Sequence, residues 1–226
     1  MKRTEYVLRR GGIYLLGLFV MALGVSISKA SDLGVSPVNS IPSVVSEITG
    51  VDMGVCTTLV FIGFIFVQLL ILRREFKPVA FVQVLCSVIF GGFVSVTGFL
   101  CGLFLPPCEN YAMRIVYVLV SIVFVALGIL LYLEANVLSL PGEGVMQALS
   151  KKTGIALSTA KMIFDWGVVI ISAILSLVCM GALVGVREGT VLAAIGVGLC
   201  LKLLGKLLRK RVQAFLAPPP QKKAVA

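Results

Sequence analysis

Two charged side chains, Lys161 and Asp165, stand close together in a chain that is 59% hydrophobic and only 13% charged. They are four residues apart in "KMIFDWG", and this spacing places both on one face of a helix. A carboxylate near hydrocarbon is costly, so it usually lines a cavity or pairs with an opposite charge. Asp165 is therefore either a proton or cation site, or half of a structural ion pair with Lys161 near the membrane interface.

Asn39 and Glu143 form a second candidate pair, because each follows a proline by two residues, Pro37 and Pro141. Both stand at the start of a short predicted helix, where unpaired N–H groups and the positive end of the dipole favour anions. Glu143 is either a coupling carboxylate or simply an N-terminal charge in a hydrated loop. Asn39 could hydrogen-bond a substrate or merely cap its helix.

Arg187 lies in "VREGT", between the last two apolar runs. It could draw an anion into an outer vestibule, or pair with Glu188 or a lipid headgroup. The chain has no histidine, which excludes Ser-His-Asp, Cys-His and His-ligated metal chemistry. It also lacks a Walker lysine loop. We therefore expect no enzyme, no cofactor and no metal site.

The elements that must position these residues are membrane-spanning helices. A mean hydropathy of +1.08 is too apolar for a soluble domain. Each apolar run is long enough to cross a core of about 30 Å as a helix. Six runs are expected to span, the last containing Lys202 and Lys206: 11–28, 53–72, 78–108, 115–133, 166–186 and 189–208. The first run, followed by "SKA", could imitate a cleaved signal peptide, but its length and its internal copy favour a retained helix.

The distribution of positive charge predicts the orientation of these spans. With the N-terminus inside, 17 of the 20 Lys and Arg residues fall in cytoplasmic segments. Both termini are therefore expected to be cytoplasmic, and the net charge of +10 reflects topology rather than affinity for nucleic acid.

An internal repeat appears when the sequence is compared with itself at an offset of 104 residues. Residues 22–50 and 126–154 share "ALG", the proline, a serine and a Thr-Gly end. Each copy reads as one span, a proline-broken segment and two more spans, so the second half would enter the membrane from the opposite side. We expect repeat 1 over about 10–106, repeat 2 over about 112–208, and a basic, disordered cytoplasmic tail over 209–226, all within one membrane domain.

The proline-broken segments are expected to form short helices. Pro37 and Pro141 suit a first helical turn, and Gly50 and Gly154 suit a C-terminal end. Each helix either folds back into the bundle or lies flat at the membrane interface. We favour the re-entrant form, since opposed half-helices commonly build a central site in inverted repeats.

"ALGVSISKASDLGVSPVNSIPSVVSEITG" and "GVREGT" resemble the YczE/YyaS/YitT family of bacterial membrane proteins, and the likeness covers nearly the whole chain. The resemblance implies a polytopic protein of the bacterial inner membrane. A transport role is presumed for that family, without a substrate or reaction to carry over.

The sequence thus predicts an all-α, multi-pass protein with six transmembrane helices in two inverted three-helix repeats. Our hypothesis is a secondary transporter of a small polar or charged solute, working by alternating access and acting as a homodimer. The alternative is a non-transporting partner or scaffold that stabilises or recruits another membrane complex through its glycine-rich faces and basic tail. The lipid bilayer is the expected surrounding in both cases, and no nucleic-acid partner is expected.

Overall fold

The computed structural model describes residues 3–76 and 78–216, and every regular element in these ranges is a helix. Two short 3₁₀ turns, η1 (Arg73–Glu75) and η2 (Pro78–Phe81), connect α3 to α4. The eight α-helices are α1 (Arg3–Ala30), α2 (Pro37–Thr49), α3 (Met53–Leu72), α4 (Val82–Phe104), α5 (Tyr111–Ala135), α6 (Pro141–Thr153), α7 (Leu157–Met180) and α8 (Glu188–Leu216).

Six of these helices, all except α2 and α6, are long and apolar enough to cross a membrane. This confirms a multi-pass, all-helical membrane protein. Several helix boundaries differ from those of the expected runs, most notably in α7 and α8. Helix α7 begins at Leu157, nine residues before the uncharged run 166–186, because Lys161 and Asp165 are compatible with helix. Helix α8 continues to Leu216, so residues 209–216 of the expected disordered tail are helical, and 217–226 lie outside the described residues.

Helices α1 and α5 lie antiparallel, in backbone contact with each other. A Cβ atom added to Gly128 would lie only 2.5 Å from the Met21 nitrogen and 2.7 Å from the Gly17 carbonyl oxygen. A Cβ atom added to Gly24 would lie 2.8 Å from the Val125 nitrogen. Small residues permit this approach, and close packing is what associates helices where water supplies no driving force.

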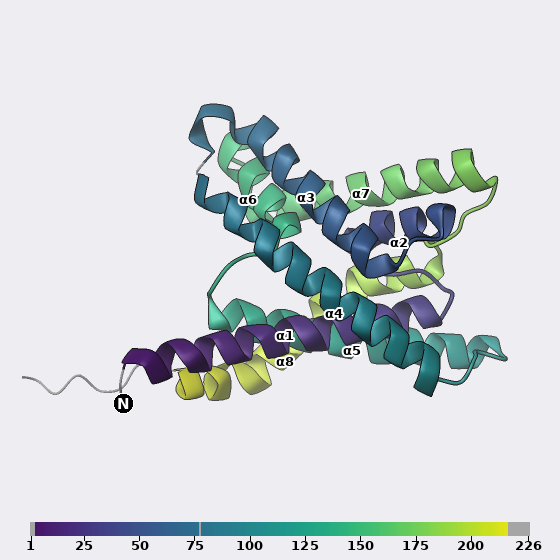
Figure 1. Ribbon diagram of the computed structural model, residues 1–226, viewed down its shortest axis with the longest axis horizontal. Coiled ribbons are helices and arrows are strands. Elements are labelled where there is room, and N and C mark those ends of the chain that lie inside the picture. The colour runs from purple at the N-terminus through teal and green to yellow at the C-terminus, as the bar shows by residue number, and fades with distance from the viewer. Residues whose placement is uncertain (1–2, 77, 217–226) are drawn as a thin grey trace, which may run out of the picture.

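The remaining helices are arranged around the α1–α5 pair. Helix α4 packs against α1, and α8 packs against α5. Figure 1 shows α4 crossing diagonally from α1 to α3, which lies above it beside α6, α2 and α7. Each short helix contacts both α3 and α7, so α2 and α6 lie between these two long helices.

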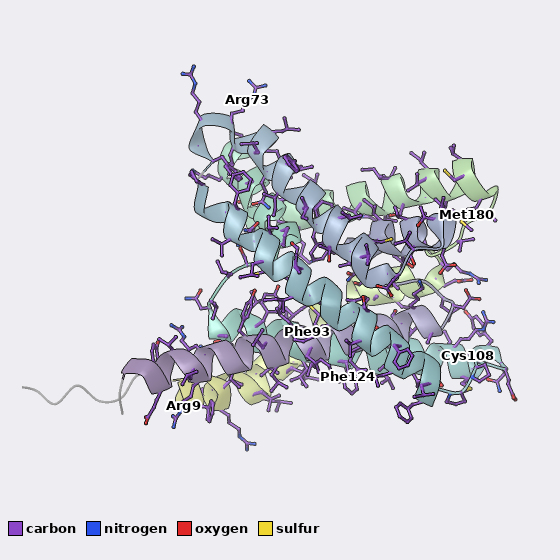
Figure 2. All side chains as sticks on the ribbon, viewed as in Figure 1. Arg9, Arg73, Phe93, Cys108, Phe124 and Met180 are labelled. Atoms are coloured by element: carbon purple, nitrogen blue, oxygen red, sulfur yellow. The ribbon has the colours of Figure 1, made fainter. Side chains whose placement is uncertain are left out.

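Figure 2 labels side chains at both ends of the bundle. Arg9 and Arg73 lie at the end where α1 begins, and Cys108 and Met180 lie at the opposite end (Figure 2). Near the first end, Glu75 bonds Lys151 at 2.9 Å. The buried polar side chains in the described part of the chain are those of Ser, Thr, Asn and Gln, and none of them is charged.

The α1–α5 contact predicts a difference between two glycines on long helices. Gly128→Ala should lower stability by about 1–3 kcal/mol, because a methyl group cannot fit against Met21 without moving the backbone. Gly92→Ala should be neutral or stabilise by up to about 1 kcal/mol, since nothing lies within 4 Å of its added Cβ and alanine favours helix. Melting temperatures of the purified variants in one detergent measure both effects. Equal melting temperatures for the two variants would contradict the close contact.

Candidate functional site

The two short helices, α2 and α6, have the same local geometry at an offset of 104 residues. Each contains 13 residues, begins with proline and ends at a left-handed glycine, Gly50 with φ 69° and Gly154 with φ 74°. Proline needs no hydrogen-bond acceptor at the first helical position, and glycine adopts positive φ without strain. In each case a serine near the C-terminal end donates to a carbonyl five residues on, Ser46 to Val51 and Ser150 to Ile155, both at 2.7 Å.

The N-terminal ends of α2 and α6 meet inside the protein. A Cβ atom added to Gly142 would lie 3.0 Å from the Val38 side chain, so these two residues are in contact. Asn39 and Glu143 are the third residues of their helices and follow this contact directly. The two candidate residues at equivalent sequence positions are therefore brought together by the fold.

Neighbouring long helices fix both short helices through polar contacts. The hydroxyl of Ser40 in α2 lies 2.7 Å from that of Ser172 in α7. The Gln68 amide of α3 donates to the Pro141 carbonyl of α6 at 3.1 Å, and its side chain packs against Gly144. The side chains of Ser40, Ser172 and Gln68 are all buried. Buried polar groups stabilise the fold when they are hydrogen-bonded.

A cavity of about 410 Å³ opens where the short helices meet. This volume lies within the range of small-molecule sites. Apolar side chains such as Phe61, Ile129 and Met146 form most of its wall. The polar residues that line it are Ser36, Asn39, Tyr132, Glu143, Gln147, Ser158, Lys161 and Asp165.

Three polar residues of this wall each have an oxygen that is buried and lacks a hydrogen-bond partner among the described residues. They are the Oδ1 atom of Asn39, the Oε2 atom of Glu143 and the Oδ1 atom of Asp165. The Asn39 amide nitrogen donates to Ser36 at 2.9 Å. Unbonded buried acceptors cost free energy, so a group that donates to them would be stabilised there.

Charge in the cavity is carried by Glu143 and by the Lys161–Asp165 pair. Lys161 Nζ lies 2.6 Å from Asp165 Oδ2, which is the i,i+4 pair that the spacing predicts. Glu143 lies in α6, which is not one of the six spans. Burial raises the pKa of Glu143 from 4.5 to about 7, against the opposing effects of Lys161 and the Leu140 backbone. Glu143 can therefore gain or lose a proton near neutral pH.

Helices α3 and α4 close tightly against each other in the first half of the chain. Gly54 and Gly91 bring the two backbones into contact, with no room for a side chain at either position. Phe61 and Phe90 stack beside them, with ring centroids 5.6 Å apart and an angle of 11° between the planes. The α3–α4 pair is therefore in direct contact beside the cavity, which Phe61 lines.

Helices α7 and α8 lack comparable packing with each other. Counting on by 104 residues, Ser158 and Ile195 replace the two glycines, and Asp165 and Ala194 replace the two stacked phenylalanines. A second cavity of about 250 Å³ lies between α7 and α8, and Asp165 and Ala194 line both cavities. The α7–α8 pair therefore lacks both the glycine contact and the aromatic stack that join α3 to α4.

Arg187 is the one candidate residue that does not line the central cavity. Its guanidinium donates to the Asp32 carbonyl at 3.0 Å and lies 3.4 Å from the Asp32 carboxylate, which also pairs with Arg114 at 2.7 Å. This cluster joins the start of α8 to the loop after α1. The same loop bonds directly to α8, since the Gly189 N–H donates to the Leu33 carbonyl at 2.8 Å.

Some residues of the site were not predicted from the sequence. Gln68 and Tyr132 lie in apolar runs that carry no motif. Ser158 could have been found by following the offset of 104 residues from Gly54. Asn39, Glu143, Lys161 and Asp165 were predicted as candidates, and all four line one cavity.

Comparisons with known proteins agree with a membrane protein of this kind. Residues 8–206 match the model of a family described as "Family of unknown function (DUF6198)". The chain is also 26% identical to the "Uncharacterized membrane protein YczE" of Bacillus subtilis (strain 168), over 96% of this chain and 99% of that protein. No solved structure matches the chain.

The raised pKa of Glu143 predicts a stability that falls as the pH rises. The folded state binds this proton more tightly than the unfolded state, so the contribution of Glu143 to stability is greatest below about pH 4.5 and is lost as the pH rises through about 7. The difference between these two values corresponds to ~3 kcal/mol at most. Melting temperatures at pH 5 and pH 8 should show this loss for the wild type, and Glu143→Gln should remove most of it. Parallel pH profiles for the two proteins would contradict the buried, titrating carboxyl.

Proposed function

The chain belongs to the DUF6198 family and is YczE-like, and from this premise we propose that it is a secondary transporter of a small solute. In this proposal the protein lies in the bacterial inner membrane with both termini in the cytoplasm. Its two halves, about 10–106 and 112–208, are inverted repeats of three spans each. The solute binds in the central cavity and is exposed to the two sides of the membrane in turn.

The contacts between α1 and α5 support the inverted relation. Gly24 packs against Val125, and Gly128 packs against Met21. Adding 104 to the number of Gly24 gives Gly128, and subtracting 104 from that of Val125 gives Met21, so the second pair is the first with the halves exchanged. Antiparallel helices that make the same contacts in reciprocal order are expected when two repeats are related by a two-fold axis in the membrane plane.

The positions of α2 and α6 support a re-entrant arrangement. Asn39 and Ser40 of α2 have no exposed surface, and Gly142 and Gly144 of α6 are buried. The helices meet at their N-terminal ends, whereas helices lying flat on opposite membrane surfaces would be separated by the bilayer core. Irregular backbone at membrane depth is tolerated when it is buried in protein or lines a cavity.

The observation that carries the transport proposal is the cavity itself, together with the two different helix pairs beside it. Four candidate residues, from α2, α6 and α7, line this cavity. In one half the corresponding long helices, α3 and α4, are packed together, whereas in the other half α7 and α8 are apart. Alternating access requires a bundle that can adopt both arrangements around a fixed site.

Cysteine cross-linking tests this proposal without knowledge of the solute. Thr58 of α3 contacts Ser87 of α4, with its hydroxyl 3.3 Å from the Ser87 carbonyl. Met162 of α7 and Val191 of α8 are the residues 104 positions later, and both line the gap between their helices. We expect Met162→Cys/Val191→Cys to form a disulfide under a membrane-permeant oxidant, because the gap closes during the cycle.

The matched control is Thr58→Cys/Ser87→Cys, which should cross-link readily in the arrangement described. Both pairs are made in a variant that lacks the native cysteines, which are Cys56, Cys86, Cys101, Cys108, Cys179 and Cys200. Cross-linking of the control pair alone, at all oxidant concentrations, would indicate a bundle that does not alternate. The protein would then fit a scaffold role better than transport.

A further inference from the structure

We propose that the central cavity binds a primary ammonium group carried on an apolar body, and that this amphiphilic cation enters from the lipid between α7 and α8. The inference rests on the proposed function, since it names the class of solute for the same site. It is carried by the acceptors in the cavity wall, by the apolar surface around them and by the position of the gap.

The first argument is the number and kind of polar atoms that lack a partner. Asn39, Glu143 and Asp165 each leave one buried oxygen without a hydrogen bond within the described part of the chain. All three are acceptors, and all three residues line the same cavity. A primary ammonium group has three N–H donors and no acceptor, as the lysine side chain illustrates. The cavity therefore offers as many acceptors as this group can use.

The second argument is the balance of charge. Glu143 and Asp165 contribute two carboxyl groups to the wall, and Lys161 contributes one ammonium. Lys161 is already bonded to Asp165 at 2.6 Å. With Glu143 ionised, these side chains carry a net charge of about −1, which a monovalent cation neutralises.

The start of the two short helices offers little to an anion. The first helical residues, Pro37 and Pro141, have no N–H group to donate. The Asn39 N–H donates to the Ser36 carbonyl at 2.9 Å, and the Gly144 N–H donates to the Leu140 carbonyl at 3.1 Å. Helix N-termini attract anions through free N–H groups, and here several of those groups are absent or bonded. The unpartnered carboxyl oxygens would also repel an anion.

The third argument is the route into the cavity. The gap between α7 and α8 is lined by Trp166, Val191 and Ile195, which are about 60% exposed and lie on spanning helices. Side chains at this location face the hydrocarbon of the bilayer. An apolar body can move from lipid through this gap, while its ammonium group reaches Asp165, which lines both cavities.

Trp166 provides a direct measurement, because it is the only tryptophan in the chain and it lines the gap. The protein is placed in lipid nanodiscs at pH 8, where Glu143 is mostly ionised and an alkylammonium group is still charged. Its fluorescence is titrated with n-hexylammonium, hexyltrimethylammonium, hexanoate and 1-hexanol. These probes share one chain and differ in charge and in N–H donors.

We expect a saturable change with n-hexylammonium, at least tenfold weaker binding of hexyltrimethylammonium, and no saturable change with hexanoate or 1-hexanol. Glu143→Gln and Asp165→Asn should each weaken hexylammonium binding at least tenfold. Glu47→Gln is the matched control, because Glu47 is an exposed carboxylate of α2 that pairs with Lys29 and does not line the cavity. The Glu47→Gln variant should bind hexylammonium with the same affinity as the wild type.

An equal response to all four probes would show partition into lipid only and would overturn the proposal. Unchanged affinity in both Glu143→Gln and Asp165→Asn would also overturn it. The transport proposal can fail on its own. If hexylammonium binds but the protein does not support its uptake into proteoliposomes, the binding site stands and the transport function is contradicted. Closure of the α7–α8 gap in cross-linking, with hexylammonium inert, would support transport and overturn the ammonium site.

Discussion

The close contact between α1 and α5 is the constraint on which the other helices depend. Inside a membrane, lipid is as apolar as the side chains, so helices associate through close packing and hydrogen bonds. Gly17, Gly24 and Gly128 let these two backbones touch. Helix α4 then packs on α1 and α8 packs on α5, which leaves α3 and α7 on one side of the pair with the short helices between them.

Once this frame is set, a few side chains decide where the protein is closed and where it is open. Two glycines and a phenylalanine stack seal α3 against α4. At the corresponding positions of α7 and α8, Ile195 and Asp165 line the cavity between the two helices. The cost of a carboxyl group at this depth is reduced by Lys161, and in our proposal by a bound ammonium group. The most polar part of the cavity therefore coincides with its least packed wall.

Much of this arrangement could be predicted from sequence because it depends on local chemistry. Apolar length predicts the spans, and proline and glycine predict the ends of α2 and α6. The convergence of Asn39 and Glu143 followed from the repeat. Tertiary packing decided the rest: Arg187 contacts Asp32 at one end of the bundle, and Gln68 enters the interior from a run without any motif. Neither contact leaves a periodic signal, since each joins residues far apart in the chain.

The packing of α2 against α7 has a consequence for how the protein is made. Ser40 and Ser172 are in contact across 132 residues, and α6 depends likewise on α3 through Gln68. During synthesis α2 is made long before α7 leaves the ribosome, and contacts between distant residues form late. A nascent chain that ends before α7 exposes the polar serines of α2 without this neighbour. The cavity is thus completed only near the end of translation.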